Sequence, residues 1–241
     1  MGKEFLREEM MFGEAALKRL QKSHVAVFGI GGVGSYSAEA LARAGVGYLT
    51  LVDHDTVSET NINRQLCALH STVGQNKSDV MAKRIHDINP ECQVRSIVRS
   101  YNEADKDFFF DQSYDYIIDA IDTVSCKLSL IENAQIKQIP IISAMGTGNK
   151  LDPTQFCITD ISKTTGCPLA RVVRKELRAR DIHHHKVLYS QELPITPLAL
   201  EAPPEGRRSV PASVSWVPSC AGLMLAGFVV QQLIADCIQT E

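Results

Sequence analysis

Apolar runs along the chain alternate with segments in which apolar residues recur at helical spacing. The runs predict buried strands at residues 25–28, 48–53, 92–98, 115–121 and 140–146. The helical spacing covers residues 35–44, 76–88, 103–110 and 124–137. Because strands that alternate with helices form parallel sheets with helices on both faces, the expected fold class is α/β: a Rossmann-like doubly wound, mostly parallel sheet.

The two ends of the chain depart from this alternation. Residues 3–22 carry apolar residues at near-helical spacing, which predicts one or two helices before the first strand. After residue 150 the pattern predicts strands at 154–161, 186–190 and 213–217, a basic helix from Pro168 to about Ala179 and an apolar helix that runs to Ile238. Residues 193–211 contain five prolines and no periodicity, so we expect a mobile loop there.

The first predicted strand leads directly into the glycine-rich sequence GIGGVG. Gly29, Gly31 and Gly34 have the G-x-G-x-x-G spacing, with Gly32 between them. A strand, a tight turn and a helix in this order leave backbone N–H groups free at the helix start, where they can bind a phosphate. Asp53 ends the second predicted strand 19 residues beyond Gly34, where a carboxylate accepts hydrogen bonds from ribose hydroxyls. The pattern therefore indicates a bound nucleotide.

The residues that follow Asp53 favour ATP over a dinucleotide such as NAD. Arg64 and Lys77 come shortly after it, and we expect both to contact phosphates. ATP carries about four negative charges, so its site needs several donors and usually a divalent cation. The pyrophosphate of a dinucleotide is served largely by the helix N-terminus and does not call for a second basic cluster.

A carboxylate at the end of a buried strand is the expected ligand of Mg²⁺. Asp122 follows the strand at 115–121, at the edge where open α/β sheets place their ligand groups. Asp119 and Asp55 are the alternatives. Asp119 lies inside an apolar strand, where an unpaired carboxylate is costly. A hydrogen-bonded structural role therefore suits Asp119 at least as well as a role as metal ligand. An alternative class of protein is a non-catalytic adaptor that only binds a nucleotide. Such an adaptor would need neither the metal ligand nor the basic cluster, so Arg64, Lys77 and Asp122 together argue against it.

Four segments together carry a family resemblance over about residues 7–160. GIGGVGS, LVDHDTVSETNINRQ, VGQNKSDVMAKRIHDINPE and IDAID resemble the ubiquitin-activating (ThiF/MoeB-like) superfamily of adenylating enzymes. Within it, the short chain and residues 152–164 and 167–178 resemble the tRNA threonylcarbamoyladenosine dehydratases. This resemblance implies an ATP-dependent ligase that dehydrates, and so cyclises, threonylcarbamoyladenosine in tRNA through a carboxyl adenylate. The alternative is adenylation of the C-terminal Gly-Gly of a small sulfur-carrier protein.

The resemblance also implies roles for particular residues. Arg64, Lys77 and Asp122 would act on the triphosphate, and Arg7 would reach the ATP of the other subunit of a homodimer. Asn61 would orient the phosphates or the arginine. The implied nucleotide contacts are Gly29, Gly31, Gly32, Gly34, Asp53, Asp55, Asn61, Arg64, Gln65, Lys77 and Asp122.

These observations predict one adenylating domain over residues 1–241. We divide it into an N-terminal helical segment (1–22), a nucleotide-binding core (23–150) and a C-terminal extension (151–241). The start of the chain has no apolar run typical of a secretory signal, so we expect a cytoplasmic protein. The final apolar stretch, about eleven residues, is shorter than the ~20 that cross a membrane, so we predict a core helix and no membrane partner.

Charge and cysteine usage narrow the expected partners. A net charge of −3 excludes coating of nucleic acid by bulk charge, so contact with tRNA needs a local basic patch. The candidates are Arg171, Arg174, Lys175, Arg178, Arg180 and Lys186, with His183, His184 and His185 expected on the surface. Seven scattered cysteines include no C-x-x-C pair, which predicts reduced thiols and no structural zinc. An intramolecular second step needs no catalytic cysteine, and Cys167 is the one left open.

Overall fold

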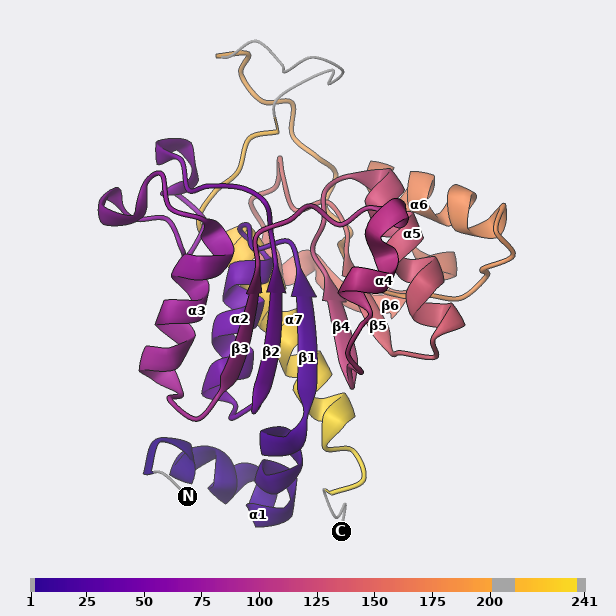
Figure 1. Ribbon diagram of the computed structural model, residues 1–241. Coiled ribbons are helices and arrows are strands. Elements are labelled where there is room, and N and C mark those ends of the chain that lie inside the picture. The colour runs from indigo at the N-terminus through magenta and orange to yellow at the C-terminus, as the bar shows by residue number, and fades with distance from the viewer. Residues whose placement is uncertain (1–2, 201–210, 238–241) are drawn as a thin grey trace.

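A seven-stranded sheet runs through the computed structural model, which describes residues 3–200 and 211–237 (Figure 1). Its strand order is β3-β2-β1-β4-β5-β7-β6, and neighbours are parallel except for the antiparallel pair β6–β7. The strands are β1 His24–Phe28, β2 Tyr48–Val52, β3 Gln93–Ile97, β4 Tyr116–Asp119, β5 Ile141–Ala144, β6 Phe156–Asp160 and β7 Lys186–Ser190. The order reverses between β1 and β4, which is where such sheets bind ligands.

Helices cover both faces of the sheet because the strands are apolar on both sides. One face carries α2 Gly34–Arg43, α3 Lys77–Ile88 and α7 Trp216–Leu233, and the other α4 Lys106–Phe109, α5 Val124–Ile136 and α6 Pro168–Arg178 (Figure 1). Strand β1 shows the alternation: Val25 and Val27 join the core under α2 and α7, whereas Ala26 and Phe28 join the core under α4 and α5. The predicted fold class, an α/β Rossmann-like sheet, is confirmed.

The N-terminal helix lies away from the carboxyl ends of the strands. Helix α1 (Leu6–Lys22) follows a 3₁₀ turn at Lys3–Phe5 and is kinked at Gly13, where φ is 81°. It sits at the end of the sheet opposite the arrowheads in Figure 1. Five more 3₁₀ turns cover Glu59–Asn61, His70–Thr72, Glu103–Asp105, Pro153–Gln155 and Ile161–Lys163.

The predicted strand at 213–217 is wrong. Helix α7 begins at Trp216 and takes in the last two residues of that segment, and no strand forms at Ser213 in the part of the chain described. Pro218 lies in the first turn of α7, where a missing N–H costs nothing because that group has no partner inside the helix. A short β-branched run before a proline thus resembled a strand, although it leads into a helix.

Helix α7 begins earlier than predicted, at Trp216, and packs against the core. It has 18 residues at a mean hydropathy of 1.3, enough by length and composition to cross a membrane, but 44% of that window is buried inside the protein. A Cβ on Gly222 would lie 2.3 Å from the main-chain oxygen of Val33, so α7 and α2 approach closely. The helix ends at Leu233, and Ile238, its predicted end, lies outside the described residues, as does 201–210 of the predicted mobile loop.

Candidate active site

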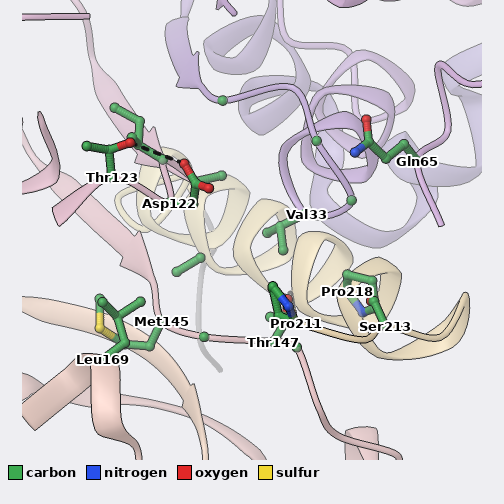
Figure 2. Close-up of a pocket in the computed structure, with 18 of the residues that line it drawn as sticks. Val33, Gln65, Asp122, Thr123, Met145, Thr147, Leu169, Pro211, Ser213 and Pro218 are labelled. Carbon is green, nitrogen blue, oxygen red and sulfur yellow. Dashed lines mark hydrogen bonds between the residues drawn. The ribbon is translucent and has the colours of Figure 1, made fainter. Parts of the chain in front are cut away.

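A cavity of about 630 Å³ opens at the carboxyl ends of β1, β2, β4 and β5, at the point where the strand order reverses. One side, the glycine-loop half, is lined by the loops that follow β1 to β4 and by Arg64, Gln65 and Lys77. The other side, the facing half, is lined by residues 144–150, 167–169, 194 and 211–213. Figure 2 shows Gln65 on one side and Met145 and Leu169 across the cavity from it.

The glycine-rich turn after β1 has the geometry that its sequence predicts. Gly29 has φ of +87°, and a Cβ there would lie 2.6 Å from the main-chain oxygen of Ala120. A Cβ on Gly34 would lie 1.8 Å from the oxygen of Gly29, so this position closes the turn against the helix start. Gly31 is open by comparison, since a Cβ would meet only Gln65 Nε2, at 3.9 Å. Gly31 therefore leaves room for a ligand to approach the backbone.

Asp53 lies on the cavity wall directly beside this turn. Its Oδ2 accepts the N–H of Ile30 at 2.6 Å, and its Oδ1 accepts the N–H of Asp55 at 2.8 Å. The carboxylate thus ties the glycine-rich turn to the loop after β2. Side-chain ligand atoms of Asp53, His54 and Asp55 also lie within 4.8 Å of one another, a spacing at which they could hold a metal ion. The ammonium group of Lys77, however, already pairs with Asp55 in this group.

The predicted phosphate contact Lys77 is buried and oriented, not a solvated surface cation. Only 5% of the residue is exposed, and its Nζ lies 2.7 Å from Asp55 Oδ2. Partial burial disfavours the charged form of Asp55, but the hydrogen bond and charge of Lys77 outweigh it and lower the pKa of that carboxyl. The Asp55 carboxylate thus holds the Lys77 ammonium in a fixed position at the edge of the cavity.

Arg64 and Gln65 line the cavity, whereas Asn61 does not. The Arg64 guanidinium donates to the main-chain oxygen of Thr60 at 2.8 Å and to Asn63 Oδ1 at 2.8 Å, and burial lowers the pKa of Arg64. Asn61 accepts the N–H of Arg64 with its main-chain oxygen, at 3.0 Å. Asn61 therefore shapes the turn that presents Arg64, while its predicted contact with the nucleotide stays a prediction.

Asp122 and Asp119 have different environments, although they are three residues apart. Asp122 is exposed on the cavity wall, and the Thr123 hydroxyl lies 3.4 Å from its Oδ1 (Figure 2). Asp119 is fully buried: its Oδ2 accepts from Lys127 Nζ at 2.6 Å and its Oδ1 accepts the N–H of Ile121 at 3.0 Å. Asp119 is therefore engaged in an ion pair with Lys127, and its bond to Ile121 fixes the loop that carries Asp122. Of the two carboxylates, only Asp122 fits a metal ligand.

Sequence reasoning missed several residues on the cavity wall. Arg99, Ser100 and Tyr101 follow β3 and line the glycine-loop half. The Arg99 guanidinium lies 3.2 Å from Asp105 Oδ2 and 4.6 Å from the centre of the Phe108 ring. A basic residue directly after a predicted strand was a usable signal. No such signal in the sequence marks Lys150 and the other residues of the facing half, because they come from segments far apart in the chain.

Arg7 and the basic helix lie outside the cavity. Arg7 is exposed on α1, at the opposite end of the sheet, so any contact with a nucleotide would have to be with that of another subunit. On α6, Arg171, Lys175 and Arg178 are exposed. Arg174 does not share their solvated face, because its guanidinium donates to Thr164 Oγ1 at 2.6 Å.

The histidine cluster was expected on the surface, and for His185 that expectation is wrong. His183 and His184 are exposed, but His185 is 5% exposed and its Nε2 lies 2.8 Å from Ser143 Oγ. Burial, with the nearby charge of Lys127, lowers the pKa of His185 to about 3. Neighbouring side chains in extended backbone point to opposite sides, so His185 turns inward just before β7.

The cysteines carry no disulfide among the described residues, and all seven are free thiols. Cys167 lines the facing half of the cavity, where it is buried at the start of α6, and Cys126 lies on the wall of the glycine-loop half. Burial raises the pKa of Cys67 to about 11, so this thiol is not a ready nucleophile.

The strand order, the glycine-rich turn and the cavity at the switch point define a Rossmann-like nucleotide-binding protein. The ThiF family matches residues 5–236, so the chain belongs to the ThiF family.

Its relatives include enzymes that act on tRNA. The chain is 48% identical over 242 residues to the tRNA threonylcarbamoyladenosine dehydratase of Bacillus subtilis strain 168, covering 97% of this chain and 95% of the relative. It is 44% identical over 169 residues to the Escherichia coli K12 dehydratase, covering 70% and 63%. The crystal structure of the E. coli enzyme in complex with ATP superposes with a TM-score of 0.87 at 34% identity, over 97% of this chain and 95% of that one.

Proposed function

We propose that this protein is an ATP-dependent tRNA threonylcarbamoyladenosine dehydratase, which cyclises the modified base through a carboxyl adenylate. One observation carries the proposal. The similarity to the Bacillus subtilis dehydratase spans 97% of the chain, so it includes the segments of the facing half as well as the glycine-rich turn. A likeness confined to the glycine-loop half would support only binding of a nucleotide.

In the first step, the carboxylate of the threonyl group attacks the α-phosphate of ATP. A C–O–P bond forms, the bond to pyrophosphate breaks, and no proton moves. Positioning and charge neutralisation account for most of the rate of such a transfer. The N–H groups at the start of α2 and the side chains of Lys77 and Arg64, which line the cavity, would supply both.

In the second step, the urea group of the modification closes on the activated acyl carbon. The acyl–oxygen bond breaks, AMP leaves with that oxygen and the urea loses one N–H proton, so the net change over both steps is the loss of one water from the nucleoside. The reaction is intramolecular, so it needs no nucleophile from the enzyme. Cys167 lines the facing half and can be tested by substitution, but the proposed chemistry does not use it.

Asp122 fits the ligand of a magnesium ion. It is an exposed carboxylate on the cavity wall at the carboxyl end of β4, and Mg²⁺ favours one or two carboxylates together with phosphate oxygens. When bound, the ion would neutralise charge on the phosphates. Within this chain, the Lys127–Asp119 pair holds the loop that presents Asp122.

The proposal includes two further partners. A homodimer would allow Arg7 of one subunit to reach the ATP of the other, since α1, which carries Arg7, lies at the end of the sheet opposite the cavity of its own chain. The exposed face of α6 formed by Arg171, Lys175 and Arg178 would contact tRNA phosphates. A tRNA substrate makes the cytoplasm the expected compartment.

Mass spectrometry of digested tRNA tests the proposal directly. After incubation with enzyme, ATP and Mg²⁺, threonylcarbamoyladenosine should lose the mass of one water, and omission of ATP should abolish the change. A parallel reaction contains a small carrier protein that ends in Gly-Gly. An unchanged nucleoside together with an adenylated carrier would replace the dehydratase assignment with that of a sulfur-carrier adenylyltransferase. Calorimetry should show that ATP binds more tightly than NAD.

A further inference from the structure

Lys150 is a buried cation on the wall of the facing half. It follows the loop after β5, lines the cavity and is 4% exposed. Most residues around it on this wall are apolar or glycine, among them Met145, Leu169 and Pro211. Among the described residues that line the facing half, Lys150 is the one with a charged side chain.

The charge of Lys150 has no carboxylate partner within the described part of the chain. Its Nζ donates to the main-chain oxygen of Glu192. An ammonium group has three donors, so this bond leaves two for a ligand. The Glu192 carboxylate accepts instead from the N–H groups of Leu151, at 2.9 Å, and Asp152, at 3.1 Å. Lys150 is therefore held in place by a neutral acceptor.

A cation in this setting carries an energetic cost. Burial lowers the pKa of Lys150, and the neighbouring Cys167 and Glu192, which raise it, offset this only in part. A buried charge that is not directly paired with a carboxylate is unfavourable, and such groups are concentrated at functional sites. The cost would be recovered if an anion enters the facing half when the substrate binds.

We propose that Lys150 binds the substrate carboxylate that becomes adenylated. The inference rests on the proposed function and adds the substrate contact that it lacks. Carboxylate and α-phosphate are both anions, and the cations Lys77 and Arg64 lie in the glycine-loop half. Lys150, across the cavity, would neutralise the attacking group as it approaches the phosphate. It gives up no proton in this step.

The test compares an acid with its uncharged amide. An anticodon stem-loop RNA that carries threonylcarbamoyladenosine, and the same RNA with the carboxylate converted to a carboxamide, are titrated into enzyme saturated with a non-hydrolysable ATP analogue. Wild type should bind the acid about 10- to 100-fold more tightly, the range of a hydrogen bond to a charged group. In Lys150→Gln, which retains an N–H donor for Glu192, the two RNAs should bind equally. Lys83→Met, an exposed lysine on α3, is the matched control.

Three results of this binding experiment would overturn the inference. The first is a preference for the acid that persists in Lys150→Gln. The second is a loss of ATP affinity in that variant, which would assign Lys150 to the phosphates. The third is a lower Tm with equal loss of affinity for both RNAs, the signature of a structural role.

The kinetic readout separates this inference from the proposed function. If wild type and Lys150→Gln dehydrate the tRNA at equal rates, only the role of Lys150 is lost. If wild type itself leaves the nucleoside unchanged, the proposed function is lost as well. The expected result is dehydration by wild type and at least a tenfold lower kcat in Lys150→Gln, with ATP affinity unchanged.

Discussion

The two halves of the cavity are held together in different ways. In the glycine-loop half, Asp53 and Asp122 follow the ends of β2 and β4, and the bond from the Ile30 N–H to Asp53 joins the loops after two neighbouring strands. In the facing half, single residues join segments that are far apart in the chain. Asn149, with φ of 59°, exchanges two 2.8 Å hydrogen bonds with Ala212 and accepts a third from the N–H of Ile195. The Trp216 indole donates to the Leu151 oxygen at 2.7 Å.

This difference matches what each half has to bind. Phosphates are recognised by backbone N–H groups and fixed cations, which a strand, turn and helix can supply locally. A substrate group is recognised by whatever side chains the surrounding loops bring together, and those vary between enzymes that share a fold. The predictions below test whether the two halves can be disturbed separately.

The largest effect is expected from Gly34→Ala. Its Cβ would lie 1.8 Å from the Gly29 oxygen, so the turn must open, and we expect a loss of more than ~3 kcal/mol of stability together with ATP binding. Gly31→Ala is the matched variant, because its Cβ meets only Gln65 Nε2 at 3.9 Å. Thermal unfolding should show a native Tm for Gly31→Ala, and calorimetry a weaker ATP affinity. A stable Gly34→Ala that binds ATP would contradict the rigid-turn argument.

The second effect separates binding from chemistry within the glycine-loop half. Asp122→Ala should keep ATP affinity within about tenfold but reduce magnesium-dependent pyrophosphate exchange by roughly 100-fold or more, since it acts on the metal and not on the adenine. Exchange is measured with modified tRNA present. If exchange is unchanged, Asp55 becomes the candidate ligand, because Lys127 occupies Asp119.

The third prediction concerns the basic face beyond the facing half. Reversal of Arg171, Lys175 and Arg178 to Glu should weaken tRNA binding and reduce the slope of log K against log salt by about one unit for each phosphate that the face no longer neutralises. ATP binding should be intact. Arg174→Met is the contrast: it breaks the bond to Thr164, so its Tm should fall while the slope stays the same. An unaltered slope in the triple variant would rule out this face as the tRNA-binding surface.

The smallest effect is a pH dependence located under the facing half. Folded His185 stays neutral down to pH about 3, whereas an unfolded histidine takes up a proton near pH 6.5. Protonation therefore favours the unfolded chain: stability is complete above pH 6.5 and decreases as the pH falls toward 3. Between pH 7 and pH 5 the expected loss is about 2 kcal/mol.

Urea unfolding at the two pH values measures this loss. His185→Gln should reduce the difference between pH 7 and pH 5, whereas His70→Gln, at an exposed histidine, should leave it unchanged. Equal pH dependence in wild type and His185→Gln would show that another group controls acid stability.

The sequence by itself determined the sheet, the glycine-rich turn and the location of Asp122. These depend on contacts between residues close in the chain, or on the rule that parallel strands end at one edge, and both leave a regular pattern. The same local rules gave the wrong result at residues 213–217, because the pattern there does not show that a helix begins at Trp216. They also misplaced His185, whose inward orientation depends on its position beside Ser143.

Only the tertiary structure decided the facing half. It showed that Lys150 lines the same cavity as Lys77, that Asn149 bonds to Ala212 and Ile195, and that Trp216 bonds to Leu151. None of these follows from spacing, since each depends on how segments separated in sequence close over the sheet. The glycine-rich turn is encoded by conformational limits of a few neighbouring residues. The facing half is encoded by packing, and packing becomes visible only when the whole chain is folded.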